Sequence, residues 1–111
     1  MTDRIIAEQE VISAVEHLDA QALRRWIDQG WVLPHRDGEN LLFDPSDVAR
    51  VRLICELHYE LRIEEDSLSV VLSLMDQLYE ARRHLNALLS AVDAQPEHVR
   101  AGISARIKAK G

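Results

Sequence analysis

Histidine, cysteine and carboxylate side chains are the groups in this sequence with the chemistry for catalysis or metal binding. The histidines are scattered and lack the spacing of a metal motif: His17, His35, His58, His84 and His98. Residues 64–66 are all acidic, and consecutive side chains point in different directions around a helix instead of converging on one proton. The sequence contains neither a phosphate-binding glycine loop nor a nucleophile elbow. It therefore predicts a non-enzyme with no catalytic residues, no metal and no cofactor.

The single cysteine, Cys55, lies in an apolar helical pattern and has no partner for an internal disulfide. We expect it to be a small buried hydrophobic residue in a reducing compartment. No apolar run approaches the roughly 18 residues of a membrane span, and the first ten residues, MTDRIIAEQE, do not resemble a signal peptide. These features predict a cytoplasmic protein with no membrane partner.

Charge is distributed unevenly along the chain. Residues 1–92 hold 17 acidic and 9 basic side chains, a net charge of −8, whereas residues 93–111 hold 2 and 4, a net charge of +2. An acidic body repels the phosphate backbone of nucleic acids and attracts basic proteins. We therefore do not expect strong DNA binding.

Helical spacing and end signals predict two short helices in the first thirty residues. Ile6, Val11, Ile12 and Val15 follow helical spacing and indicate a helix over about 8–16. The next helix covers 20–29, with Leu23, Trp26 and Ile27 on one face, Asp19 as its N-cap and Gly30 as the left-handed residue that ends it.

A small hairpin and a third helix follow. Residues 31–34 are expected to be extended because Pro34 disfavours helix at Leu33, and Asp37-Gly38 begins a turn from which the strand 41–43 returns. The third helix covers about 44–61, with Asp44 as cap and Pro45 in the first turn. Its predicted buried stripe is Val48, Val51, Ile54, Cys55 and Leu61.

A regular heptad pattern begins at Leu68, with one polar exception at Arg82. Its members are Leu68, Val71, Met75, Leu78, Arg82, Leu85, Leu89 and Val92. The pattern favours a homodimer formed through this helix; the alternative is one helix that packs the stripe on its own domain. We expect three parts: a winged-helix domain over 1–62, a dimerisation helix over 63–92, and a basic tail over 93–111.

The tail after Pro96 has two interpretations. Val99, Ile103 and Ile107 lie four residues apart among four basic side chains, which indicates a weak amphipathic helix that could contact anionic lipid, nucleic acid or the acidic body. The alternative is a frayed and solvated segment, as is common at chain ends.

The segment LRRWIDQGWVLPHRDGENLLFDPSDVARVRLICEL and the order of its elements resemble the MerR-like winged-helix family over about residues 5–92. The resemblance implies a mainly α fold: a winged helix-turn-helix with a small β-hairpin wing and a long C-terminal coiled-coil helix. The DNA-binding members carry an arginine on the returning wing strand. Here that strand reads ENLLFD, with no cation between Arg36 and Arg50.

A narrower resemblance covers residues 43–92. The stretch HYELRIEEDSLSVVLSLMDQLYEARRHL looks like the chaperone-modulator proteins that regulate a DnaJ-like co-chaperone, the curved-DNA-binding J-protein. That resemblance implies a dimeric adaptor that binds the J-domain and blocks its action on Hsp70. For the partner-binding surface we expect acidic side chains with apolar anchors beside them, where the third helix meets the long one: Glu56, Leu57, Glu60, Leu61, Glu64, Glu65, Leu72 and Asp76.

Two other functions stay open. Arg24 and Arg25 on the second helix and Arg36 on the wing are compatible with a MerR-like transcription regulator whose second helix enters the major groove. An unrelated structural dimer is the third possibility.

Overall fold

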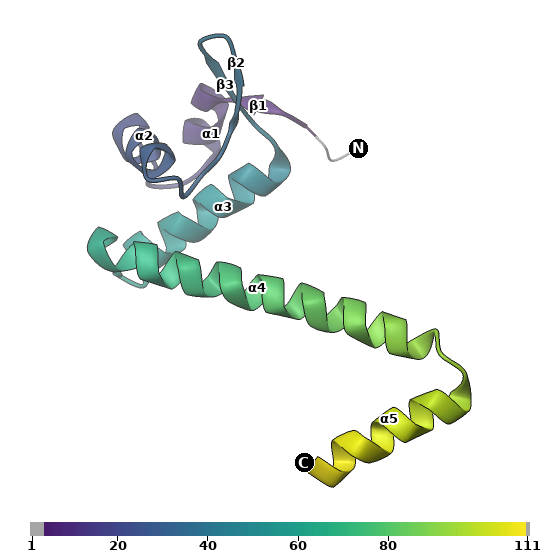
Figure 1. The fold of residues 1–111 in the computed structure, drawn as a ribbon. Coiled ribbons are helices and arrows are strands. Elements are labelled where there is room, and N and C mark those ends of the chain that lie inside the picture. Colours follow the sequence, from purple (N-terminus) through teal and green to yellow (C-terminus); the bar gives the residue numbers. More distant parts are fainter. Residues whose placement is uncertain (1–3, 111) are drawn as a thin grey trace. The chain divides into compact units, whose positions relative to one another are not determined.

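The computed structural model describes residues 4–110, which form a mostly helical chain with one small sheet (Figure 1). Contacts divide the chain into two units, one through Leu72 and one from Ser73 on, so the division falls inside the longest helix. The elements in order are β1 (Ile6–Ala7), α1 (Glu8–Ala14), α2 (Ala20–Asp28), β2 (His35–Asp37), β3 (Asn40–Phe43), α3 (Pro45–Cys55), η1 (Glu56–Glu60), α4 (Glu65–Asp93) and α5 (Glu97–Lys110).

Local signals at the helix ends act as predicted. The carboxylate of Asp19 accepts a hydrogen bond from the amide of Ala22 at 2.8 Å and so caps α2. Asp44 caps α3 through the amide of Asp47 at 2.9 Å, and the Asp47 carboxylate accepts from the Asp44 amide at 3.0 Å, which completes a capping box. Gly30 has a φ of 79°, the left-handed conformation expected after α2.

The sheet contains one strand more than the predicted hairpin. The hairpin of β2 and β3 forms as expected, and β1 pairs antiparallel with the other edge of β3, so the strand order is β1-β3-β2. Ile6 lies opposite Phe43, in the strand rather than in the helical stripe where its spacing placed it. Two residues are too few to show the alternation by which a strand is recognised.

One core joins the helices and the strands β1 and β3 of the first unit, whereas all three residues of β2 are exposed. Trp26 of α2, Phe43 of β3 and Val51 of α3 are fully buried. The first two turns of α4 also contribute, because Leu68 and Leu72 are 0% and 1% exposed. The remaining buried members are Val11, Val15, Leu18, Ala22, Leu23, Val32, Leu41, Ile54, Cys55 and Leu57.

The third helix departs from the prediction at its C-terminal end. Residues 56–60 form a π-helix, with the amide of Leu61 bonded to the carbonyl of Glu56 at 2.9 Å, instead of continuing the α-helix to 61. The wider turn inserts an extra residue and shifts the faces of the helix. As a result Leu57 is buried at 7% exposure, and Leu61 is 67% exposed although its spacing placed it in the buried stripe.

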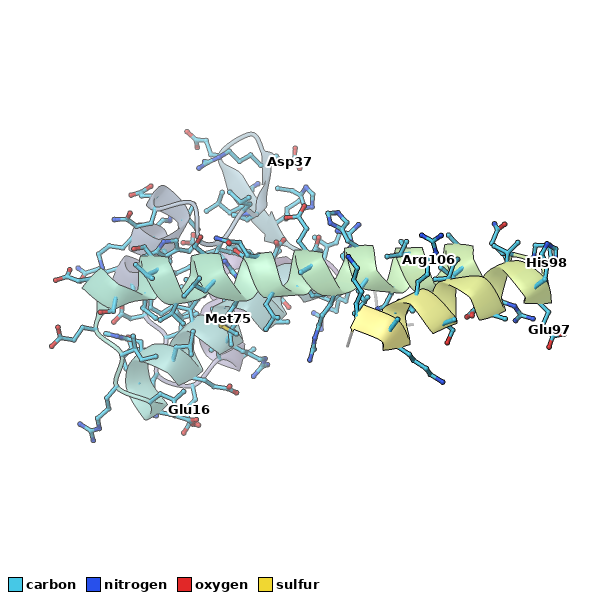
Figure 2. All side chains as sticks on the ribbon, turned by 60° about the horizontal axis from the view of Figure 1, so that its bottom comes forward. Glu16, Asp37, Met75, Glu97, His98 and Arg106 are labelled. Carbon is cyan, nitrogen blue, oxygen red and sulfur yellow. The ribbon has the colours of Figure 1, made fainter. Side chains whose placement is uncertain are left out.

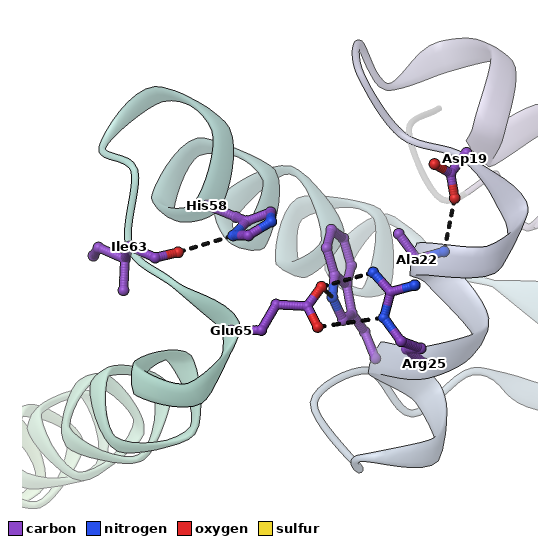
Figure 3. Close-up of polar contacts among 7 residues, drawn as sticks. Asp19, Ala22, Arg25, His58, Ile63 and Glu65 are labelled. Atoms are coloured by element: carbon purple, nitrogen blue, oxygen red, sulfur yellow. Dashed lines mark hydrogen bonds and ion pairs between the residues drawn. The ribbon is translucent and has the colours of Figure 1, made fainter.

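The chain then reverses into α4 through a short link. Arg62 has a left-handed φ of 58°, the amide of Ile63 bonds to the carbonyl of Leu57 at 2.9 Å, and His58 donates from Nδ1 to the carbonyl of Ile63 at 2.8 Å (Figure 3). These bonds fix where α4 begins relative to the end of η1.

The second unit consists of the rest of α4, a short connection and α5. The predicted tail segment is helical from Glu97 to Lys110, and none of these residues is buried. Figure 2 labels Glu97, His98 and Arg106 on this helix. Within residues 4–110, no helix has both the length and the apolar character needed to cross a membrane.

Candidate functional site

Helix α2 occupies the position at which helix-turn-helix proteins carry their recognition helix. Both of its arginines are bound by carboxylates of the same chain. Arg24 forms a bidentate pair with Glu8, with Nε–Oε2 at 2.7 Å and Nη2–Oε1 at 2.8 Å. Arg25 forms a second pair with Glu65 of α4, with Nη2–Oε1 at 2.7 Å and Nε–Oε2 at 3.3 Å (Figure 3). The indole of Trp26 also donates to Glu65, at 3.3 Å.

These contacts keep both carboxylates ionised. The hydrogen bond from Arg24 lowers the pKa of Glu8 below its ordinary value. The pKa of Glu65 is lowered mainly by the hydrogen bond from Arg25 and further by that from Trp26. At neutral pH each arginine of α2 therefore faces a full negative charge that a DNA phosphate would have to displace. Both pairs were missed by sequence reasoning, because their members lie 16 and 40 residues apart.

The hairpin contributes little positive charge to the surface that would face DNA. His35 lies 3.4 Å from the carboxylate of Asp44, and Asp37 and Glu39 flank the turn (Asp37 is labelled in Figure 2). The described residues of α2 and the hairpin include several basic side chains. Among them, Arg36 alone forms no ion pair with another residue of the chain.

One group at the base of the hairpin has metal-ligand chemistry that the sequence did not reveal. His35, Asp44 and Asp47 place possible ligand atoms within 4.8 Å of one another. The two carboxylates already form the capping box of α3, however. The pKa of Asp44 is lowered to about 2, first by the hydroxyl of Ser46 and then by the amide of Asp47. The geometry is that of a helix cap rather than that of a set of free ligands.

The residues predicted to bind a partner differ in exposure and in the contacts that they make. Glu56, Glu60 and Glu64 are exposed around η1, and Leu61 is exposed beside them. Leu57 and Leu72 are core residues, so the prediction that they anchor a partner is wrong. Glu65 binds Arg25 within its own chain. Asp76 is exposed on α4 in the second unit.

A hollow of about 130 Å³ lies beside the exposed carboxylates of η1. Its lining comes from the turn after α1 and from α3 and η1: Val15, Glu16, His17, Arg52, Cys55, Glu56 and Glu60. His17 has a left-handed φ of 68°, and its ring lies 5.8 Å from that of Tyr59. Glu16 and His17 were not among the predicted site residues, because only the tertiary fold brings this turn to η1.

Cys55 forms part of the floor of this hollow. It is 6% exposed, and burial raises the pKa of its thiol to about 11, so the thiol is protonated at neutral pH. A buried protonated thiol is a poor nucleophile. The prediction that Cys55 is a small buried residue is confirmed.

The apolar stripe on α4 shares Val71, Leu78, Leu85 and Val92 with the predicted seam and differs from it at the positions between them. Leu68 lies in the core and is unavailable to a second copy, and Met75 is less exposed than its neighbour Leu74, at 36% against 59%. The exposed stripe runs with spacings of three and four through Leu74, Leu78, Ala81, Leu85 and Leu88, and half-buried Val71 and Val92 lie at its two ends. It needs no polar member, whereas the predicted seam contained Arg82. Met75, Arg82 and Leu89 lie on its flank.

Comparison with known proteins identifies the family. The family described as MerR HTH family regulatory protein matches residues 6–89, from β1 through most of α4 and without α5. A search among curated proteins found no match. The matched segment contains α1, α2, the hairpin, α3 and most of α4, and a regulatory family agrees with the expectation of a non-enzyme. This chain belongs to the MerR family of helix-turn-helix regulatory proteins.

Proposed function

We propose that the chain is a non-enzymatic adaptor that binds the J-domain of a DnaJ-like co-chaperone and inhibits its stimulation of Hsp70. The observation that carries this proposal is the internal neutralisation of Arg24 and Arg25 on α2. Membership of a regulatory family together with a neutralised reading helix favours a partner other than DNA. The resemblance of residues 43–92 to the chaperone modulators supplies the identity of that partner.

The charge around η1 supports a basic protein partner. Glu56, Glu60 and Glu64 are exposed, and Leu61 is an exposed apolar side chain among them. Complementary charge speeds association and selects the partner, while buried apolar contacts provide much of the affinity. Affinity should therefore fall as salt rises, mainly through the association rate.

We further propose that the adaptor is a homodimer formed through α4. A monomer would expose Leu74, Leu78, Leu85 and Leu88, each more than half accessible, on one face of the helix. A continuous apolar stripe of this kind is typical of a protein interface.

Titration calorimetry of the full chain with the purified J-domain of its own organism's co-chaperone tests the proposal. We expect a complex with micromolar or tighter affinity that weakens as salt rises, and a reduced stimulation of the Hsp70 ATPase by the co-chaperone. No heat and no complex at tens of micromolar would contradict the proposed function.

The second candidate function is a DNA-binding transcription regulator, which family membership and the unpaired Arg36 favour. If the ion pairs on α2 prevent DNA binding, the double variant Glu8→Gln/Glu65→Gln should release Arg24 and Arg25 for phosphate contacts. We expect nonspecific DNA affinity at low salt to rise on the order of tenfold, because two cations become available. Fluorescence anisotropy with a labelled duplex measures the change.

The matched control for this experiment is Glu80→Gln/Glu97→Gln. It removes two negative charges from exposed positions on α4 and α5, where neither carboxylate forms an ion pair among the described residues, and it leaves both arginine pairs of α2 intact. An equal rise in the control would mean that net charge alone limits DNA binding. A sequence-specific footprint of the wild-type chain at physiological salt would favour the regulator over the adaptor.

A further inference from the structure

The hollow between the turn after α1 and the α3–η1 helix has the chemistry of a socket for a cationic side chain. We infer that it receives one lysine or arginine side chain from a basic protein segment. The identity of that protein rests on the proposed function, whereas the socket follows from the residues that line the hollow.

Two core residues, Val15 and Cys55, supply an apolar and preformed part of the lining. Val15 and Cys55 are 4% and 6% exposed and belong to the core, so they do not need to move to line the hollow. Lysine and arginine place their aliphatic stems along apolar surface while their charged ends stay in contact with polar groups. The volume of about 130 Å³ is close to that of a cavity that admits benzene, about 150 Å³, and so suits one side chain rather than a helix.

The rim of the socket carries negative charge that the chain does not neutralise. Glu16, Glu56 and Glu60 face one cation, Arg52, which leaves a net charge of −2 around the opening. Among residues 4–110, none of these three carboxylates forms an ion pair, in contrast to Glu8, Glu10 and Glu65. Two elements far apart in sequence supply them, Glu16 from the turn and the others from η1 (Glu16 is labelled in Figure 2).

The lining favours a side chain over a free metal ion. In the described part of the chain, one group of side chains has its possible metal ligands close together: His35, Asp44 and Asp47. None of these residues lines the hollow. Among the described residues, the carboxylates of the rim therefore do not belong to a group that brings three ligand atoms within 4.8 Å of one another. That arrangement matches a long side chain with a charge at its end better than it matches a small spherical cation.

The test compares two double variants of the full chain that each remove two exposed carboxylates. Glu56→Gln/Glu60→Gln neutralises the rim, and Glu39→Gln/Glu80→Gln is the matched control on the hairpin turn and α4. We expect the rim variant to bind the J-domain about 10- to 100-fold more weakly at low salt, since it loses charges that meet a partly desolvated cation. The control should change affinity by less than about threefold.

Amide shifts of the ¹⁵N-labelled chain locate the contact and separate the two proposals. We expect shifts at residues 15–17 and 55–60 on addition of the J-domain, and the same shifts with a synthetic lysine-rich helical peptide. If only the peptide produces them, the socket stands and the proposed function fails. If the J-domain binds without shifts at these residues, or binds both double variants equally well, the function stands and the socket is wrong.

Discussion

The Leu85→Glu variant should be a monomer under conditions in which the wild-type chain is a dimer. Leu85 is 54% exposed at the centre of the α4 stripe, and two copies would bury it together with Leu78 and Leu88. Burial of one leucine contributes about 1.5–3 kcal/mol, and the substitution removes two in a symmetric dimer and adds two charges. We therefore expect the dissociation constant to rise by more than about 100-fold.

Light scattering and sedimentation at micromolar concentration measure this effect. Ala87→Glu is the matched control, because Ala87 is exposed on the opposite side of α4 and receives the same charge. A wild-type chain that is monomeric at these concentrations would end the dimer proposal.

The same measurement tests the register of the stripe. Leu74 and Met75 are neighbours in sequence, but Leu74 lies on the exposed stripe and Met75 lies on its flank. Leu74→Glu should dissociate the dimer, while Met75→Glu should leave it largely intact. The reverse result would restore the seam that the sequence predicted.

Features set by local interactions were predictable from the sequence. The caps at Asp19 and Asp44 and the left-handed Gly30 depend on residues a few positions away, and the structure has each of them as expected. The strand β1 was missed because two residues show no periodicity, and its existence depends on Phe43, far along the chain.

The errors in site residues have two physical causes. The π-helix at 56–60 shifts the faces of the third helix, which buries Leu57 and exposes Leu61. The first turns of α4 pack on the core, so Leu68 and Leu72 serve the domain instead of a second copy or a partner. Periodicity alone indicates that a helix has an apolar face, but the tertiary fold decides which turns are covered.

The site itself was the least predictable feature. Sequence reasoning selected Glu65 as a partner-binding residue from its charge, whereas its pairing with Arg25 and Trp26 makes it part of the domain. Glu16 and His17 enter the hollow only because the turn after α1 and η1 meet in the fold. That the partner is a basic protein stays a prediction from charge composition, and the composition did not identify which carboxylates are available to bind one.

A large loss of stability is expected from substitution of Trp26, which joins the core to the ion pair between Arg25 and Glu65. Its side chain is fully buried, and its indole N–H donates to Glu65. Trp26→Ala should lower the free energy of unfolding by about 3–5 kcal/mol, through lost burial and the cavity left behind. Because small domains are stable by only about 5–15 kcal/mol, much of the population should be unfolded well below the wild-type melting temperature.

Trp26→Phe separates the two roles of this residue. It keeps an aromatic ring in the core and removes only part of the volume and the N–H donor, so we expect a smaller loss, roughly 1–2 kcal/mol. Urea unfolding followed by circular dichroism measures both variants. If Trp26→Ala lowered the free energy of unfolding no more than Trp26→Phe does, the core would be closing the cavity left by the side chain, and the predicted cavity effect would be wrong.

The stability that the charge of Glu65 provides through Arg25 and Trp26 should decrease as pH falls. The pKa of Glu65 is lowered in the folded chain from an ordinary value of 4.5. The ionised carboxylate therefore adds to the free energy of unfolding fully above pH 4.5, and this contribution is lost as pH falls through the lower folded pKa. Glu65→Gln should therefore be less stable than wild type at pH 7, and the difference should vanish in acid. A difference that persists unchanged well below pH 4 would mean that the glutamine side chain disturbs the packing around Trp26, and that the charge of Glu65 is not what stabilises the junction between α2 and α4.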